Sequence, residues 1–171
     1  MSNLISTVPG AFNALYGLLA AAGQEQSPPI PVFHTEVISG EELQNGYVLL
    51  RAVDGHNFDP AALGSYAFYE TYDVCGEVVY YQGGPDPITM ATDVLNQTWS
   101  IYQNVVMTTA VLNRGANGEQ VLGDAAPEAV EWCIPVSGEY TGEPGTIGAG
   151  QDGLIGTIEF RYNVKARITT A

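Results

Sequence analysis

Residues 158–168, IEFRYNVKARI, carry the pattern that decides the fold class of this chain. Apolar and polar side chains alternate at all eleven positions. A period of two is typical of a β-strand that buries one face and exposes the other. Three of the five basic side chains of the protein lie on the polar face, namely Arg161, Lys165 and Arg167. The segment therefore predicts a half-buried strand with a basic outer face.

The segments before this strand predict further strands and two helices. Residues 8–22 and 87–113 place apolar side chains at helical spacing. Pro9 and Pro87 suit the first turns of these helices. The other predicted strands cover residues 31–39, 47–54, 66–81 and 128–141. Turn-forming composition predicts mobile loops at about 55–65 and 141–153.

The element order is α-β-β-β-α-β-β, which indicates an α+β fold. With 171 residues, the chain has the length of one domain. We expect residues 1–171 to form a single domain with a mostly antiparallel β-sheet of about five strands. Both helices are expected to pack on one face of this sheet.

The protein is strongly acidic, with 19 Asp and Glu against 5 Lys and Arg and a formal net charge of −14. Residues 1–157 carry a net charge of −16, whereas residues 158–171 carry +2. Binding to a nucleic acid needs clustered cations that displace counterions from the phosphates. The composition therefore argues against a protein that holds nucleic acid.

Few side chains suggest catalysis or metal binding. His34 and His56 lack a second ligand at metal-binding spacing, and no nucleotide-binding or hydrolase motif is present. Cys75 and Cys133 are too few for a disulfide framework, although a single bridge is compatible with the sequence. We expect no enzymatic activity, no cofactor and no metal.

An apolar segment leaves another class of protein open. Residues 11–22, AFNALYGLLAAA, have the composition of a signal-peptide core, but no Lys or Arg precedes them. Twelve residues are also too few to cross a membrane. We interpret the segment as a helix of the fold and expect no membrane association. A small secreted binding domain or hydrolase is the more distant alternative.

The basic strand face and an excess of tyrosines predict a protein–protein interface. On an acidic protein, a row of cations finds many partners on an identical neighbouring subunit, and exposed aromatic side chains are common in protein contacts. A solvated strand face and cross-strand aromatic pairs are the alternatives. The predicted interface residues are Arg161, Lys165, Arg167, Arg51, Tyr69 and Tyr81.

The order and pattern of the segments resemble the tail terminator proteins of long-tailed bacteriophages, especially those of actinobacterial siphophages. The resemblance covers nearly the whole chain. It lies in ALYGLLAAA, IPVFHTEVI, YVLLRAV, FYETYDVCGEVVYYQGG, DPITMATDVLNQTWSIYQNVV and the closing strand IEFRYNVKARIT. The strong acidity and the Gly-rich segment 141–153 depart from the family pattern.

The resemblance implies a structural role without catalytic residues. Such proteins form a hexameric ring that docks on the tail tube, ends its polymerisation and offers a surface to the head connector protein. The ring would be part of the virion, would assemble in the cytoplasm of the bacterial host, and would let the genome DNA pass through its lumen. A tail tube or head-completion protein of the same phage class is the alternative.

Overall fold

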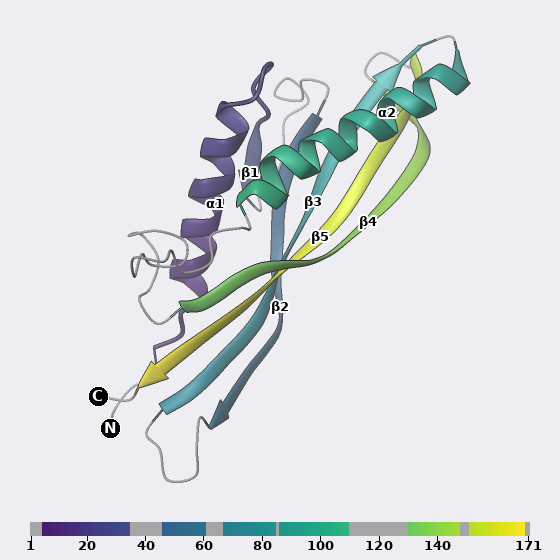
Figure 1. Cartoon of the computed structure of the whole chain (residues 1–171). Coiled ribbons are helices and arrows are strands. Elements are labelled where there is room, and N and C mark those ends of the chain that lie inside the picture. The colour runs from purple at the N-terminus through teal and green to yellow at the C-terminus, as the bar shows by residue number, and fades with distance from the viewer. Residues whose placement is uncertain are drawn as a thin grey trace.

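In the part of the chain that the structure describes, five strands form one sheet in the spatial order β1-β2-β3-β5-β4, and two α-helices accompany it (Figure 1). The computed structural model describes residues 5–34, 46–60, 67–84, 86–109, 130–147 and 151–169. The elements are α1 (Val8–Gln24), β1 (Val32–His34), β2 (Gly46–Pro60), β3 (Ala67–Gly83), α2 (Pro87–Ile101), β4 (Val130–Ile147) and β5 (Gln151–Thr169). β1 and β2 are parallel, and the other neighbouring strands are antiparallel. The predicted α+β class and element order are thus confirmed.

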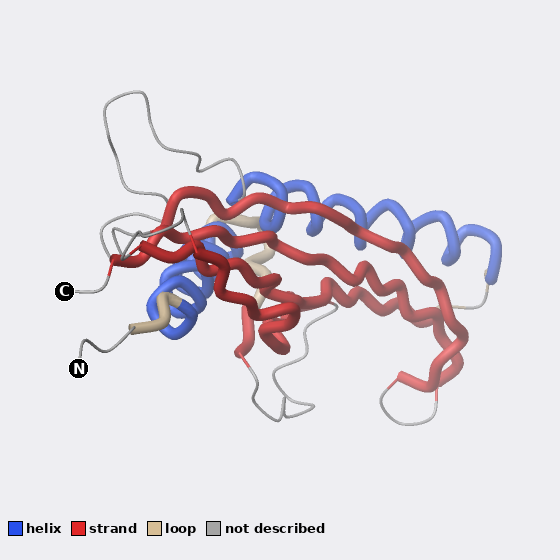
Figure 2. The backbone as a smooth tube through the Cα atoms, turned by 90° about the horizontal axis from the view of Figure 1, so that it is seen from below, coloured by secondary structure: helices blue, strands red, loops and turns tan. Residues whose placement is uncertain are grey.

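The centre of the sheet is the long pairing of β3 with β5. It runs from Ala67 opposite Thr169 to Gly83 opposite Gly153 without a register shift. The strands twist strongly along their length, and β4 and β5 extend beside α2 as a long hairpin (Figures 1 and 2). The alternation predicted for residues 158–168 is confirmed, since its apolar side chains are buried.

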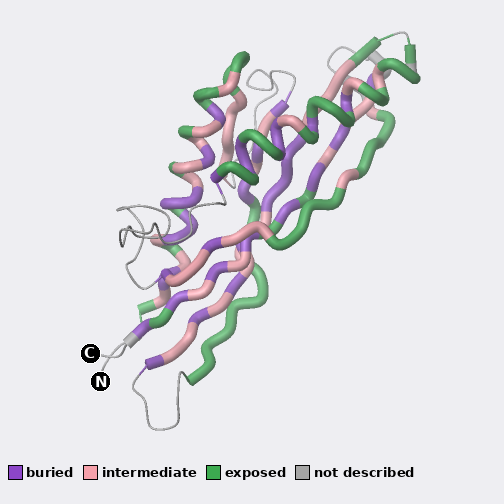
Figure 3. Tube along the Cα trace, viewed as in Figure 1, coloured by how far each residue is buried: buried purple, intermediate pink, exposed green. Residues whose placement is uncertain are grey.

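Both helices pack on the same face of the sheet. The core joins Leu15 and Leu19 of α1 to Val105 and Val106, which follow α2. The sheet contributes alternate side chains of its central strands to this core (Figure 3). These sheet residues are Tyr72, Val74, Val78, Ile158, Phe160, Tyr162, Val164 and Ala166. The opposite face of the sheet carries the intervening, mostly polar positions.

The two predicted mobile loops are wrong over the described residues. Residues 55–60 belong to β2, where 55 and 56 lie in a bulge and 57–60 pair with β3, while 141–147 and 151–153 form the ends of β4 and β5. These strand ends are mostly exposed, so they have no apolar alternation from which a strand could be predicted. The neighbouring strand nevertheless satisfies their backbone groups. Residues 61–65 and 148–150 lie outside the described residues.

The predicted second helix has a different geometry at its end. α2 stops at Ile101, and Tyr102–Met107 form a π-helical segment. The wider turn lets the adjacent Val105 and Val106 both be fully buried. Residues 110–113 of the predicted helix and 35–39 of the first predicted strand lie outside the described residues.

Candidate functional site

The face of the sheet opposite the helices is the candidate functional site, and we call it the open face. Within the described residues, neither helix packs on it. On β3 it carries the odd-numbered residues from Tyr69 to Tyr81, and on β5 those from Thr157 to Arg167, because the even-numbered positions enter the core. All cations that the structure describes lie on this face, namely Arg51, Arg161, Lys165 and Arg167.

Two arginines lie in the middle of the open face and contact carboxylates of neighbouring strands. Arg51 occupies a β-bulge of β2 between Leu50 and Ala52, and its guanidinium lies 2.5 Å from the Glu77 carboxylate. Arg161 lies 3.8 Å from Asp54 and 3.9 Å from Asp73. Both arginine side chains are about half exposed, and the two contacts of Arg161 are long, so the Arg161 pairs contribute little to stability.

Lys165 lies between two aromatic rings. Its Nζ is 4.0 Å from the centre of the Tyr69 ring and 4.6 Å from that of Trp132. The indole Nε1 of Trp132 donates to Asn163 Oδ1 at 3.0 Å, and Asn163 Nδ2 donates to Asp73 Oδ1 at 2.9 Å. The rings attract the ammonium and the hydrogen bonds fix the indole, so this end of the open face is ordered before any partner binds.

Three glutamates lie side by side across the open face. Glu159 of β5 is directly opposite Glu77 of β3 on one side and Glu139 of β4 on the other. We call these three residues the acidic row. Glu77 is buried and pairs with Arg51, whereas Glu139 and Glu159 are exposed and form no ion pair with the described residues. Like charges directly opposite each other destabilise a sheet.

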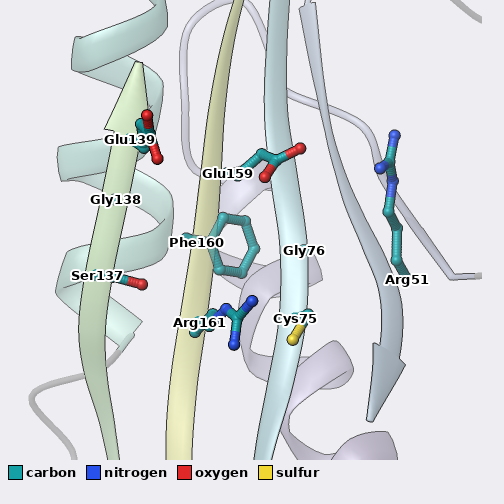
Figure 4. Close-up of a pocket in the computed structure, with 9 residues that line it drawn as sticks. All are labelled: Arg51, Cys75, Gly76, Ser137, Gly138, Glu139, Glu159, Phe160 and Arg161. Carbon is teal, nitrogen blue, oxygen red and sulfur yellow. The ribbon is translucent and has the colours of Figure 1, made fainter. Parts of the chain in front are cut away.

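A depression of about 410 Å³ lies next to the acidic row (Figure 4). Glu139 and Ser137 of β4, Glu159 and Arg161 of β5, and Cys75 of β3 line it. Burial raises the pKa of the Cys75 thiol, and Asp54, Asp73 and Glu159 raise it further, although Arg161 opposes them. The thiol is therefore a weak nucleophile, and the depression is lined by fixed charges of both signs.

The structure places the predicted interface residues on one face but not in one cluster. Arg51 and Arg161 flank the central depression, and Lys165 contacts Tyr69. Arg167 is opposite Tyr69 and exposed. Tyr81 is opposite Ile155, far along β3 from Tyr69. Sequence reasoning missed the acidic row because it depends on the strand register.

Trp132 was also missed as a surface residue. A bulge between Val130 and Trp132 reverses the facing of β4, so that Cys133 enters the core and the indole reaches the open face. The exposed apolar side chains along α2 and its π-helical extension were not anticipated either, and they are Ile88, Leu95, Trp99 and Met107.

A second cluster of polar residues lies partly buried at the start of α1. Glu70 accepts hydrogen bonds from the Thr7 amide at 2.7 Å, from the hydroxyls of Ser6 and Thr7 at 2.5 Å, and interacts with His56 Nε2 at 2.8 Å. The Ser6 hydroxyl thus donates to a carboxylate rather than to an imidazole base. In a Ser–His pair, the serine hydroxyl donates to the imidazole, which activates it as a nucleophile. We therefore interpret this cluster as an anchor for the start of α1.

The other histidine and the cysteines are also placed without a catalytic or metal-binding constellation. His34 stacks edge-on against Phe12 and Tyr16. Cys75 and Cys133 are free thiols. Among the described residues, no three His, Cys, Asp or Glu side chains come close enough to share a metal ion, and none of the described helices is long and apolar enough to span a membrane.

No protein-family model matches the chain, and no curated protein sequence matches it either.

Proposed function

We propose that this protein is a tail terminator of a long-tailed bacteriophage and that six copies form a ring on the end of the tail tube. The observation that carries the proposal is the open face. It gathers the described cations with Tyr69 and Trp132 on the side of the sheet away from both helices. A surface of this composition suits contacts between acidic subunits. The element order resembles that family.

The net charge supports a ring through which DNA passes. Six copies of a chain with a charge of −14 carry a formal charge of −84. A lumen of negative potential repels phosphates, so the genome can move through it without being held. The ring would stop polymerisation of the tail tube protein on one side and meet the head connector protein on the other. The proposal assigns no catalytic activity and no cofactor, and it places the protein in the virion after assembly in the host cytoplasm.

Native mass spectrometry of the purified protein tests the ring. We expect a species of about 109 kDa, which is six times the 18.2 kDa of the chain. A protein that stays monomeric at high concentration, with no ring in virions, would contradict the proposal. Long polymers, or a copy number in the virion far above six, would instead indicate a tail tube protein.

Omission of the protein from phage assembly tests the role of the ring. We expect tails of uncontrolled length, because nothing then ends tube polymerisation. Tails of normal length that fail to join heads would favour another neck protein, such as a head-completion protein.

A further inference from the structure

The open face carries two charged patches that the isolated chain leaves uncompensated. Glu139 and Glu159, the exposed members of the acidic row, lie beside the central depression. Arg167 lies towards the end of β5, is exposed, and forms no ion pair within the described part of the chain. Lys165 stands on the same face two residues before it.

These patches cannot neutralise each other within one copy. Glu159 and Arg167 are eight residues apart on the same extended strand. At ~3.3 Å per residue, their backbones are about 26 Å apart, which exceeds the combined reach of the two side chains. The sheet also fixes both patches, because Glu159 pairs with β3 and β4 and Arg167 pairs with β3. Arg167 therefore cannot reach Glu139 and Glu159 of its own copy, while Arg51 and Arg161, which line the same depression, contact Glu77, Asp54 and Asp73.

We propose that the acidic row of one copy binds Arg167 of the next copy in the ring, with Lys165 of that copy as the second cation. The inference rests on the proposed function, because it names the contact through which identical copies assemble. To the proposed function it adds the residues that meet at the contact between copies. It also gives the ring a direction, since each copy offers its acidic row to one neighbour and its cations to the other.

A second copy is the occupant that this charge pattern favours. Each chain carries both the acidic row and the cations, on the same face and at different heights along β5, so neighbouring copies complement each other by a shift along the strand. Repeated in one direction, such a contact joins two different patches and closes a ring when the rotation allows it. Two copies with antiparallel strands would instead satisfy both contacts in a closed dimer, and a dimer in native mass spectrometry would overturn the ring contact. A nucleic acid would gain from Arg167 but would meet Glu139 and Glu159 on the same face.

Charge reversal at the two exposed positions tests the contact. In Glu159→Arg, the new arginine would repel Arg167 of the neighbouring copy. In Arg167→Glu, the acidic row would meet a further carboxylate. We expect each single variant to raise the concentration needed for half-assembly at least about tenfold, because juxtaposed like charges disfavour association. Sedimentation velocity over a concentration series measures this shift.

Restoring complementarity distinguishes this contact from general damage. The double variant Glu159→Arg/Arg167→Glu exchanges the charges of this one pair, with Glu139 and Lys165 unchanged, and should assemble better than either single variant. An equimolar mixture of the two single variants should also form rings, with the variants alternating. In such a ring, native Glu159 meets native Arg167 at one interface, while the two reversed side chains meet at the next. Native mass spectrometry resolves the mixed rings.

Glu25→Arg is the matched control. It makes the same change in charge at an exposed position next to the end of α1, away from the open face, and should assemble like the wild type. All positions in the test are exposed, so each variant should still fold, which circular dichroism below the assembly concentration checks. If the wild type forms rings and both reversals form them equally well, the contact is overturned while the proposed function stands. The contact is also overturned if the single variants fail and neither the double variant nor the mixture recovers. If the wild type forms no ring, the proposed function and this contact fall together.

Discussion

Glu70 is a charged residue on the core face of the sheet, and its surroundings explain how the fold tolerates it. Burial of the carboxylate raises its pKa, but hydrogen bonds from Ser6, Thr7 and His56 outweigh this effect and lower it below the usual value. The Thr7 amide lies at the start of α1, where the helix favours a negative charge. In the sequence, Glu70 is only a charged exception in an apolar pattern. Its hydrogen-bonding partners could not be predicted, because they come from segments far apart in the chain.

This environment makes the stability of the protein depend on pH. A carboxylate whose pKa is lowered in the folded state stabilises the fold above its unfolded pKa of ~4.3, and this stabilisation is lost as the pH falls through the folded pKa. We expect Glu70→Gln to lower the free energy of unfolding by about 1–3 kcal/mol at pH 7, and to weaken its decline below pH ~4.3. Urea denaturation at pH 7 and pH 3 measures both effects. Glu25→Gln is the exposed control, and a pH dependence that is unchanged in Glu70→Gln would refute the assignment.

At the scale of the elements, α1 contributes to the core. Leu15 and Leu19 are fully buried against the sheet and the π-helical segment. We expect Leu15→Ala to lower the free energy of unfolding by about 2–5 kcal/mol, whereas Asn13→Ala on the exposed side should change it by less than ~0.5 kcal/mol. Chemical denaturation compares the two variants. N-terminal sequencing of the protein from its host provides a second check, since a chain starting near Gly23 would instead favour a secreted protein.

The strands show how far sequence patterns reach. Residues 158–168 are predictable because one face enters the core and the other faces solvent, which forces the alternation. The ends of β2 and β4 are not predictable from such a pattern, because they extend past the core. They are held by pairing with the neighbouring strands β3 and β5. Gly145 illustrates this, because it pairs with Gly153 of β5 although glycines in a sequence otherwise suggest a loop.

The candidate site was predictable in composition but not in arrangement. The basic face of β5 follows from alternation alone. The acidic row requires the pairing of three strands, and the position of Trp132 requires a bulge. Bulges and register are set by contacts between distant segments, and a shift of one residue moves every side chain to the other face. The sequence therefore indicates which residues face outward on one strand, but not which residues they meet.

At the scale of the whole molecule, the charges separate into a cation-bearing open face and an otherwise acidic body. The described cations all lie on the open face, which the proposed ring would place in contacts between copies. Assembly would therefore withdraw the cations from solvent and leave acidic side chains to determine the potential of the ring. A ring should then repel DNA more strongly than its separate subunits do.

This separation predicts that the assembled protein does not retain DNA. We expect no retardation of a DNA duplex in an electrophoretic mobility assay at ~50 mM salt, where phosphate contacts are strong and a basic protein of similar size retards the duplex. The concentration should be one at which native mass spectrometry shows rings. Retardation that weakens steeply as salt is added would show that cations remain accessible to phosphates. That outcome would contradict both the burial of Arg167 between copies and the passage of DNA through a repelling lumen.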